Sequence, residues 1–256
     1  PALKAAQVGV AMGQRGTDVA REAADIVLLD DSFPSIIGGI QLGRRIFTNL
    51  RKALIFITAT HIPIAGLALL PVLFALPPLF FPMHVILLEL AIDPVCSLVF
   101  EAEPATPAIM RQPPRKHALL FGRPELLLSI VQGSVILATA FSLYYGLLHF
   151  GYDVTEARAA GFIAVILGNL TLAFADSAEV GTSFFDIRRY AFWGIFFSMF
   201  VVVSILLLHD GVSALFQISR PPLPVLALTI LASLVAGSWF GVGKLLAGIF
   251  PVANSS

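Results

Sequence analysis

The sequence predicts a mainly α-helical fold, in which a bundle of six membrane-spanning helices follows a short α/β segment. Hydrophobic residues make up 57% of the chain and charged residues only 12%, whereas soluble domains contain about 45–50% apolar residues. The mean hydropathy is +0.89. Six apolar stretches each approach the roughly 20 residues that a helix needs to cross a bilayer. These observations indicate an integral, multi-pass membrane protein with the lipid bilayer as its surroundings.

The first 50 residues differ from the rest, because they carry charges, glycines and a mixed periodicity. Short buried strands are predicted at 7–12 and 26–29, with a helix at 17–25 between them. A long helix then begins near Phe33 and continues through Lys52 into the membrane. The α/β segment is too short to fold as a domain, so we expect it to close a larger α/β domain that lies upstream.

The six spans are predicted at about 53–75, 82–101, 125–149, 158–178, 190–209 and 223–248. Basic residues near the ends of these spans decide the orientation, because cytoplasmic loops are enriched in lysine and arginine. One side carries Arg44, Arg45, Arg51, Lys52, Arg111, Arg115, Lys116, Arg123, Arg188, Arg189 and Lys244, and the other side only Arg158 and Arg220. Both termini and the 102–124 loop are therefore predicted to be cytoplasmic, and we expect the protein in the plasma membrane.

Charge and cysteine content exclude several classes of function. The formal net charge is zero, so nothing indicates a nucleic-acid partner. The only cysteine, Cys96, excludes an internal disulfide and a paired-cysteine metal or redox site.

The second span contains two carboxylates and a proline within an otherwise apolar run. A charged side chain at membrane depth costs roughly 2.5–3.5 kcal/mol, so it usually faces a bundle interior and marks an ion path. Glu89 and Asp93 are four residues apart, which places both on one helix face. Pro94 loosens the helix there and frees carbonyl oxygens that could join the carboxylates as cation ligands. The alternative is a carboxylate pair satisfied by neighbouring helices, without a transport role.

The N-terminal segment contains three specific runs, Pro1–Ala6, Gly9–Gly13 and Gly16–Asp31. These runs and several later segments closely resemble P-type cation-transporting ATPases. The N-terminal runs look like the end of the family's phosphorylation domain, a HAD-like α/β fold, and 43–52 looks like the stalk of its fifth membrane helix. The acidic span and the loop at 110–115 are similar to the calcium-pump-like branch, and we expect a bacterial member.

The resemblance implies an ATP-driven cation pump and places this chain at its C-terminal end. The expected organisation is 1–32 as the end of the phosphorylation domain, 33–52 as the stalk helix, 53–248 as the membrane domain and 249–256 as a tail. ATP and Mg²⁺ would bind to upstream domains. The partners of this chain would be the transported cation and the actuator, nucleotide-binding and N-terminal membrane segments of the same pump. We expect no catalytic or cofactor-binding residue in this chain, and no ATPase activity from it alone.

Carried over from the family, the cation ligands are Glu89, Asp93 and His61, with Asn169 as a further candidate. Ile64 and Ile92 stand where the calcium pump has an acid and a hydroxyl residue, which removes oxygens that calcium favours. We therefore expect a single-ion site. The imidazole of His61 could ligate a softer metal, carry a counter-transported proton, or simply form a hydrogen bond within the bundle.

Two other functions stay open from the sequence. One is a secondary transporter or channel that uses the carboxylates without ATP; the other is a non-catalytic membrane subunit. The α/β segment argues against the first, since such a protein has no use for a partial soluble domain. Asp176 and Glu179, at the end of the fourth span, are predicted to be solvated.

Overall fold

A computed structural model describes residues 1–101, 103, 109–111, 113, 119–177 and 190–249. It contains two compact units, residues 1–48 with 104–116, and residues 49–103 with 117–256. The tail from residue 250 lies outside the described part. So do Arg115, Lys116, Glu179, Arg188 and Arg189, on which some sequence predictions depend.

The first unit contains the predicted strand–helix–strand segment. Strand β1 (Val10–Met12), helix α2 (Asp18–Ala23) and strand β2 (Ile26–Leu28) are each shorter than predicted. The strands are parallel, with Val10 opposite Ile26. A short helix, α1 (Ala2–Ala5), and a single 3-10 turn, η2 (Ile109–Arg111), were not predicted.

Helix α2 begins where the sequence provides a cap. The Thr17 hydroxyl accepts a hydrogen bond from the Ala20 N–H at 3.2 Å, which satisfies one of the free donors of the first turn. The glycine before this cap is required for close packing, because a Cβ atom on Gly16 would lie 2.0 Å from the Met12 carbonyl oxygen.

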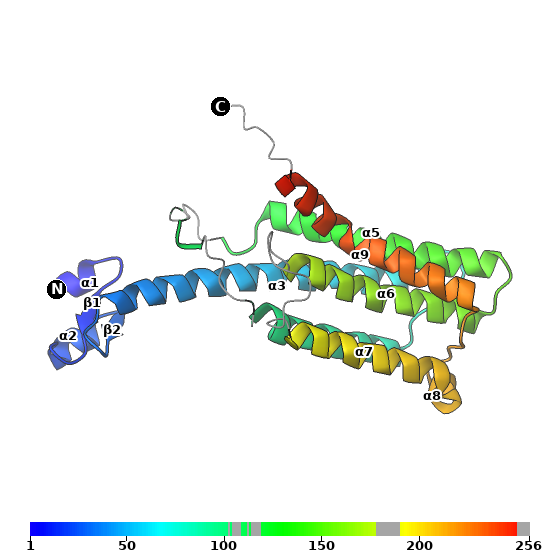
Figure 1. The fold of residues 1–256 in the computed structure, drawn as a ribbon, viewed down its shortest axis with the longest axis horizontal. Helices are drawn as coiled ribbons and strands as arrows, with labels where there is room; N and C mark the ends of the chain where they lie inside the picture. Colours follow the sequence, from blue (N-terminus) through cyan, green and yellow to red (C-terminus); the bar gives the residue numbers. More distant parts are fainter. Residues whose placement is uncertain (102, 104–108, 112, 114–118, 178–189, 250–256) are drawn as a thin grey trace, which may run out of the picture. The chain divides into compact units, whose positions relative to one another are not determined.

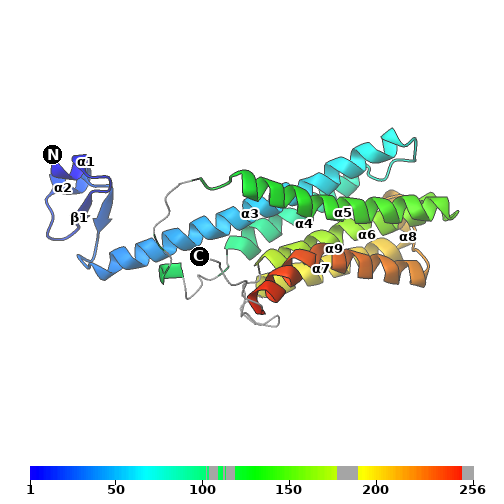
Figure 2. The ribbon, with the colours of Figure 1, turned by 90° about the horizontal axis from the view of Figure 1, so that it is seen from above.

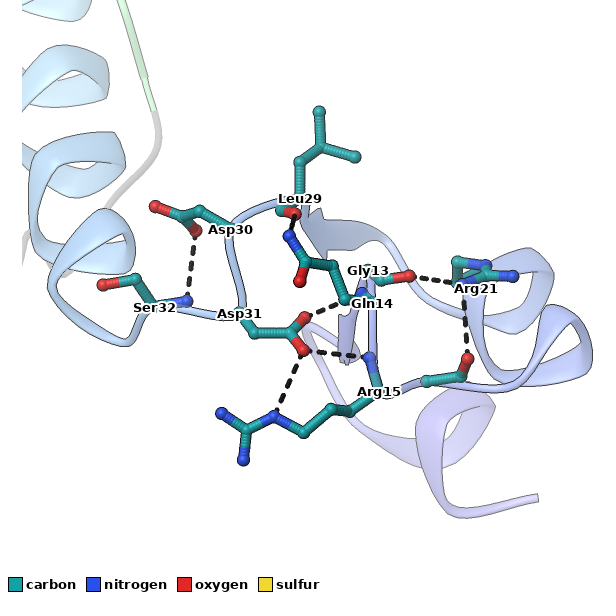
Figure 3. A network of polar contacts seen from close by, with 9 residues as sticks. Gly13, Gln14, Arg15, Arg21, Leu29, Asp30, Asp31 and Ser32 are labelled. Atoms are coloured by element: carbon teal, nitrogen blue, oxygen red, sulfur yellow. Dashed lines mark hydrogen bonds and ion pairs between the residues drawn. The ribbon is translucent and has the colours of Figure 1, made fainter.

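Two neighbouring aspartates fix the chain after β2. Asp31 accepts hydrogen bonds from the backbone N–H groups of Gln14 and Arg15, each at 2.9 Å (Figure 3). The Gln14 N–H is the main cause that lowers the pKa of Asp31 below its ordinary value. Asp30 accepts from the Ser35 hydroxyl at 2.6 Å, and this bond is the main cause that lowers the pKa of Asp30. Both carboxylates therefore favour the charged form.

The second unit is a helical bundle. Its helices are α3 (Pro34–Leu73, which belongs to both units), α4 (Pro82–Pro94), the π-helix η1 (Val95–Phe100), α5 (Arg123–His149), α6 (Val154–Ser177), α7 (Tyr190–Leu208), α8 (Asp210–Leu215) and α9 (Leu223–Ile249). Within the described residues, five helical segments are long and apolar enough to cross a membrane. The predicted span at 190–209 forms α7, whose apolar part, Phe192–Leu208, is shorter.

Helix α6 is the centre of this bundle. It packs against α5, α9 and α7, and both views place it among them (Figures 1 and 2). Its contact with α9 is close, since a Cβ atom on Gly237 would lie 2.5 Å from the Gly168 carbonyl oxygen. Small residues of this kind let membrane helices approach without a hydrophobic driving force.

Helices α3 and α5 are joined at two levels. Arg51 forms an ion pair with Glu125, whose other oxygen accepts the Gly122 N–H at 2.8 Å at the start of α5. About two turns after Arg51, the Ala59 carbonyl receives no hydrogen bond from Pro63, which has no N–H. Gly133 of α5 approaches this carbonyl so closely that a Cβ atom there would lie 2.3 Å from the oxygen.

The role of Asp31 predicts a change in amide exchange. Asp31→Ala should accelerate hydrogen exchange at the Gln14 and Arg15 amides, because their acceptor is lost. In the wild-type chain, the contribution of Asp31 is complete above its ordinary pKa of about 4 and disappears as the pH falls through the lowered folded-state value. Exchange mass spectrometry measures both effects. Asp18→Ala is the control, and equal exchange in the two variants would contradict the assignment.

The contact between α3 and α5 predicts a loss of stability. Gly133→Ala should lower the free energy of unfolding by about 1–3 kcal/mol, because the new Cβ meets the Ala59 backbone rather than a flexible side chain. Gly146 lies on the same helix, and its Cβ position meets nothing within 4 Å. Gly146→Ala should therefore leave the stability unchanged or raise it. Thermal unfolding in detergent compares the two, and a similar loss in both would refute the close contact.

Candidate cation site

The two carboxylates of the second span lie on one face of α4. Glu89 is partly buried and Asp93 is exposed. Leu88 and Ile92 lie on a different face and are buried. Pro94 cannot donate to the Leu90 carbonyl, and the helix continues as the π-helix η1 directly after it. The carboxylates thus stand next to an irregular stretch of backbone, a feature that is frequent at functional sites.

His61 of α3 faces Glu89 across the gap between the two helices. Its Nδ1 atom lies 2.8 Å from the Ile57 carbonyl oxygen, and its Nε2 atom lies 3.7 Å from the Glu89 Oε1 atom. A carbonyl oxygen only accepts, so Nδ1 carries the hydrogen and the Nε2 atom of a neutral ring presents a lone pair. The Glu89 Oε1 atom, 3.7 Å from this nitrogen, is a carboxylate oxygen and is also an acceptor.

This pair is not covered within the described part of the chain. The side chains of His61 and Glu89 are 53% and 38% exposed. An ionisable residue open to hydrocarbon is costly, and such residues nearly always face a bundle interior or a water-filled cavity. The exposed face therefore indicates that this site is incomplete without further protein or water.

Asn169 of α6 lines a small cavity instead. The cavity has a volume of about 10 Å³, and its lining includes Phe56 of α3, Ile92 of α4 and Val95 of η1. Asn169 is 4% exposed, and neither atom of its amide finds a hydrogen-bond partner among the described residues. A cavity of this size has room for about one water molecule, and leaving such a group unsatisfied costs about 1–3 kcal/mol.

The structure thus brings His61 and Glu89 together and places Asp93 on the face of Glu89. Asn169 meets the other face of α4, with Ile92. Ile64 is buried as well, so both positions where the sequence lacks a ligand oxygen belong to the packed core. Within the described residues, no three histidine, cysteine, aspartate or glutamate side chains gather closely enough to hold a metal ion.

One sequence prediction is wrong. Asp176 was expected to be solvated, but it is only 6% exposed. Both of its carboxylate oxygens accept from the Gln132 Nε2 atom, at 3.1 and 3.2 Å. The reason is that α6 is surrounded by other helices along most of its length, so a residue near its end is still covered.

Sequence reasoning also missed two buried polar residues. His84 is fully buried and Arg158 is 4% exposed. Arg158 was counted only as a basic residue near a membrane surface. The many alanines and glycines among the residues of α6 were the available signal that a charge there would be enclosed.

The unsatisfied amide predicts an unusual response to substitution. Asn169→Leu should leave the thermal stability of the chain unchanged or raise it, because an apolar side chain of similar size removes the desolvation penalty. Asn49 is a matched control, since it is 7% exposed and its Nδ2 atom donates to the Glu103 carbonyl oxygen at 3.0 Å. Asn49→Leu should be destabilising. Equal losses in the two variants would show that Asn169 has a partner in the folded chain.

Comparisons with known proteins give the chain its family. Residues 77–246 match the family described as "Cation transporting ATPase, C-terminus". "Calcium-transporting ATPase 1" of Yarrowia lipolytica is 34% identical over 145 residues, which is 57% of this chain and 16% of that protein. "Sodium/potassium-transporting ATPase subunit alpha-A" of Artemia franciscana is 35% identical over 147 residues, 57% of this chain and 14% of that protein.

A bacterial relative, "Calcium-transporting ATPase 1" of Bacillus cereus, is 37% identical over 138 residues, which is 53% of this chain and 15% of that protein. The chain thus spans only about one sixth of the length of these relatives. Calcium-transporting and sodium/potassium-transporting proteins are both among them. Because the family match covers well over half of the chain, the protein belongs to the C-terminal family of cation-transporting ATPases.

Proposed function

We propose that this chain is the C-terminal part of an ATP-driven cation pump, in which Glu89, Asp93 and His61 bind the transported cation and Asn169 supplies a further ligand. The pump would be a multi-pass protein of the plasma membrane, with both termini of the chain in the cytoplasm. The single observation that carries the proposal is the approach of the His61 Nε2 atom to the Glu89 carboxylate.

Two acceptors that face each other need a positive group between them. The Nε2 and Oε1 atoms are 3.7 Å apart, which is too far for a direct hydrogen bond. A metal ion between them would bond to both lone pairs, and a proton on Nε2 would convert the pair into an ion pair. The same two side chains can therefore hold a cation or, after it leaves, a proton. This pairing suits a pump that exchanges its cation for protons.

The type of ion follows from the donor set. One imidazole nitrogen with carboxylate and amide oxygens suits a borderline metal better than calcium, which takes 6–8 oxygen ligands. The buried Ile64 and Ile92 reduce the supply of oxygen further. We therefore propose one ion per site. Because the relatives are named as calcium-transporting and sodium/potassium-transporting proteins, calcium and sodium are the alternative ions. Phosphorylation measured across a panel of cations would distinguish them.

Other parts of the pump would complete the site and drive it. The exposed side of His61 and Glu89 would be covered by additional membrane segments, which would remove the cost of an open charge in hydrocarbon. ATP and Mg²⁺ would bind to catalytic domains that the relatives' greater length can accommodate. Helix α3, which carries His61, has residues in both compact units.

The carboxylates predict a specific defect in the complete pump that contains this chain. Glu89→Gln and Asp93→Asn should abolish cation-dependent phosphorylation by ATP, because each removes a ligand charge. Phosphorylation from inorganic phosphate should survive, since it uses the cation-free state. Labelled ATP and labelled phosphate measure the two reactions. Asp153→Asn, in the exposed connection before α6, is the matched control.

Two further results would test the role of His61 and the role of the carboxylate pair. His61→Gln should change the pH dependence or the ion preference of phosphorylation across a panel of calcium, sodium, zinc and manganese. If both carboxylate variants kept the cation dependence of the wild-type pump, the pair would be structural and the transport site would have to lie elsewhere.

A further inference from the structure

Arg158 is a buried charge that the proposed cation site does not use. It lies near the start of α6 and is 4% exposed. No carboxylate among the described residues pairs with its guanidinium. Burying an ion without a partner of opposite charge is costly, so the surroundings must supply other strong hydrogen bonds.

Backbone carbonyls provide these bonds. The Nε and Nη2 atoms donate to the Pro78 carbonyl oxygen at 3.2 and 3.0 Å, and the Nη1 atom donates to the Gln217 carbonyl oxygen at 2.6 Å. Pro78 lies between α3 and α4, and Gln217 lies between α8 and α9. The guanidinium carbon is also 4.8 Å from the centre of the Phe81 ring. The rigid fork of arginine can reach all three groups at once, whereas a lysine presents a single point charge.

These partners define the beginning of α4. Phe81 is the N-cap residue of α4, and its N–H donates to the His84 Nδ1 atom at 3.1 Å. A second side chain holds the same connection, since the Tyr144 hydroxyl of α5 donates to the Pro77 carbonyl oxygen at 2.6 Å. The first turn of α4 is therefore fixed by both α5 and α6.

The two ends of α4, the helix that carries Glu89 and Asp93, thus differ in structure. Its first turn is held by hydrogen bonds and aromatic contacts, with the fully buried His84 packed edge-on against Phe162 at 4.9 Å. Its other end has Pro94 and continues as a π-helix. Glu89 lies seven residues after Pro82, about 10 Å along a helix. An unbroken helix carries the orientation of its first turn to this carboxylate.

We infer that Arg158 is a positioning residue for cation binding, which acts through α4 by holding the helix start and so the orientation of Glu89 and Asp93. This inference rests on the proposed function for its consequence in transport. The holding contact itself stands on the bonds around Arg158 and has its own test.

The first test measures the contact in the 256-residue chain, reconstituted in lipid nanodiscs. Arg158→Gln should accelerate hydrogen exchange in residues 82–88, while exchange in the buried middle of α6 stays unchanged. Arg220→Gln is the matched control, because Arg220 is exposed and lies in the connection that also contains Gln217. Uniform acceleration along all helices would make Arg158 a general stability residue and overturn the inference.

The second test measures the consequence in the complete pump. Arg158→Gln should raise the cation concentration for half-maximal phosphorylation by about tenfold, with little change in the maximum, because small displacements of ligands weaken binding strongly. Arg158→Lys should shift in the same direction, since it keeps the charge but loses the fork. A wild-type response from Arg158→Lys would show that charge alone matters and would overturn the role of the fork.

A milder variant keeps the inference testable if Arg158→Gln does not fold. Tyr144→Phe removes only the bond to Pro77 and should shift the cation requirement in the same direction, by about two- to threefold. Faster exchange at residues 82–88 with no change in cation requirement would support the contact between Arg158 and the start of α4. It would refute the effect of this contact on the carboxylates. If phosphorylation of the wild-type pump did not depend on a cation, the proposed function would be refuted instead.

Discussion

The need to satisfy polar groups away from water is the constraint on which this bundle depends. Hydrocarbon offers no hydrogen bonds, so each buried polar side chain must find a partner within the protein. Most do: Arg158 reaches two carbonyls, and Gln132 donates to Asp176. Asn169 stands out because neither polar atom of its amide has a partner among the described residues, whereas His84 and Gln132 each leave only one buried atom unsatisfied. The His61–Glu89 pair stands out because it is partly exposed and its atoms are too far apart for a direct hydrogen bond. Apolar side chains at these positions would give a more stable fold. The presence of polar groups there therefore favours a binding role.

Proline shapes the same helices that carry the candidate ligands. Pro63 lies two residues after His61, and Pro94 lies one residue after Asp93. Each proline removes one backbone donor, and the bundle responds differently at the two places. Gly133 packs against the carbonyl that Pro63 leaves free, whereas the backbone after Pro94 becomes π-helical. The backbone before Pro63 is therefore closely packed against α5, and the backbone after Pro94 is irregular.

The sequence was sufficient for the parts of the fold that follow from periodicity. The two strands and helices at the six expected spans could be predicted, although only five of the described helical segments are long and apolar enough to cross a membrane. The shared face of Glu89 and Asp93 could be predicted as well. Long-range contacts could not. Nothing in the local sequence shows that Arg158 reaches Pro78, 80 residues away, or that Asp176 is enclosed by Gln132. Whether His61 and Glu89 face each other depends on how α3 and α4 are rotated about their axes, which periodicity does not determine. The resemblance to a family was the reason to group these two residues.

The choice of ion depends on how many ligands the chain can supply. Ile64 and Ile92 are 9% and 3% exposed, so they fill core positions rather than leave room for water near the carboxylates. Asn169 lies across α4 from Glu89, in a cavity of about 10 Å³. A cation that requires many oxygens must therefore draw most of them from carbonyls, water or other segments. In the proposed site, a proton or a metal that needs only a few nitrogen and oxygen donors would find two candidate ligands, His61 and Glu89, already facing each other.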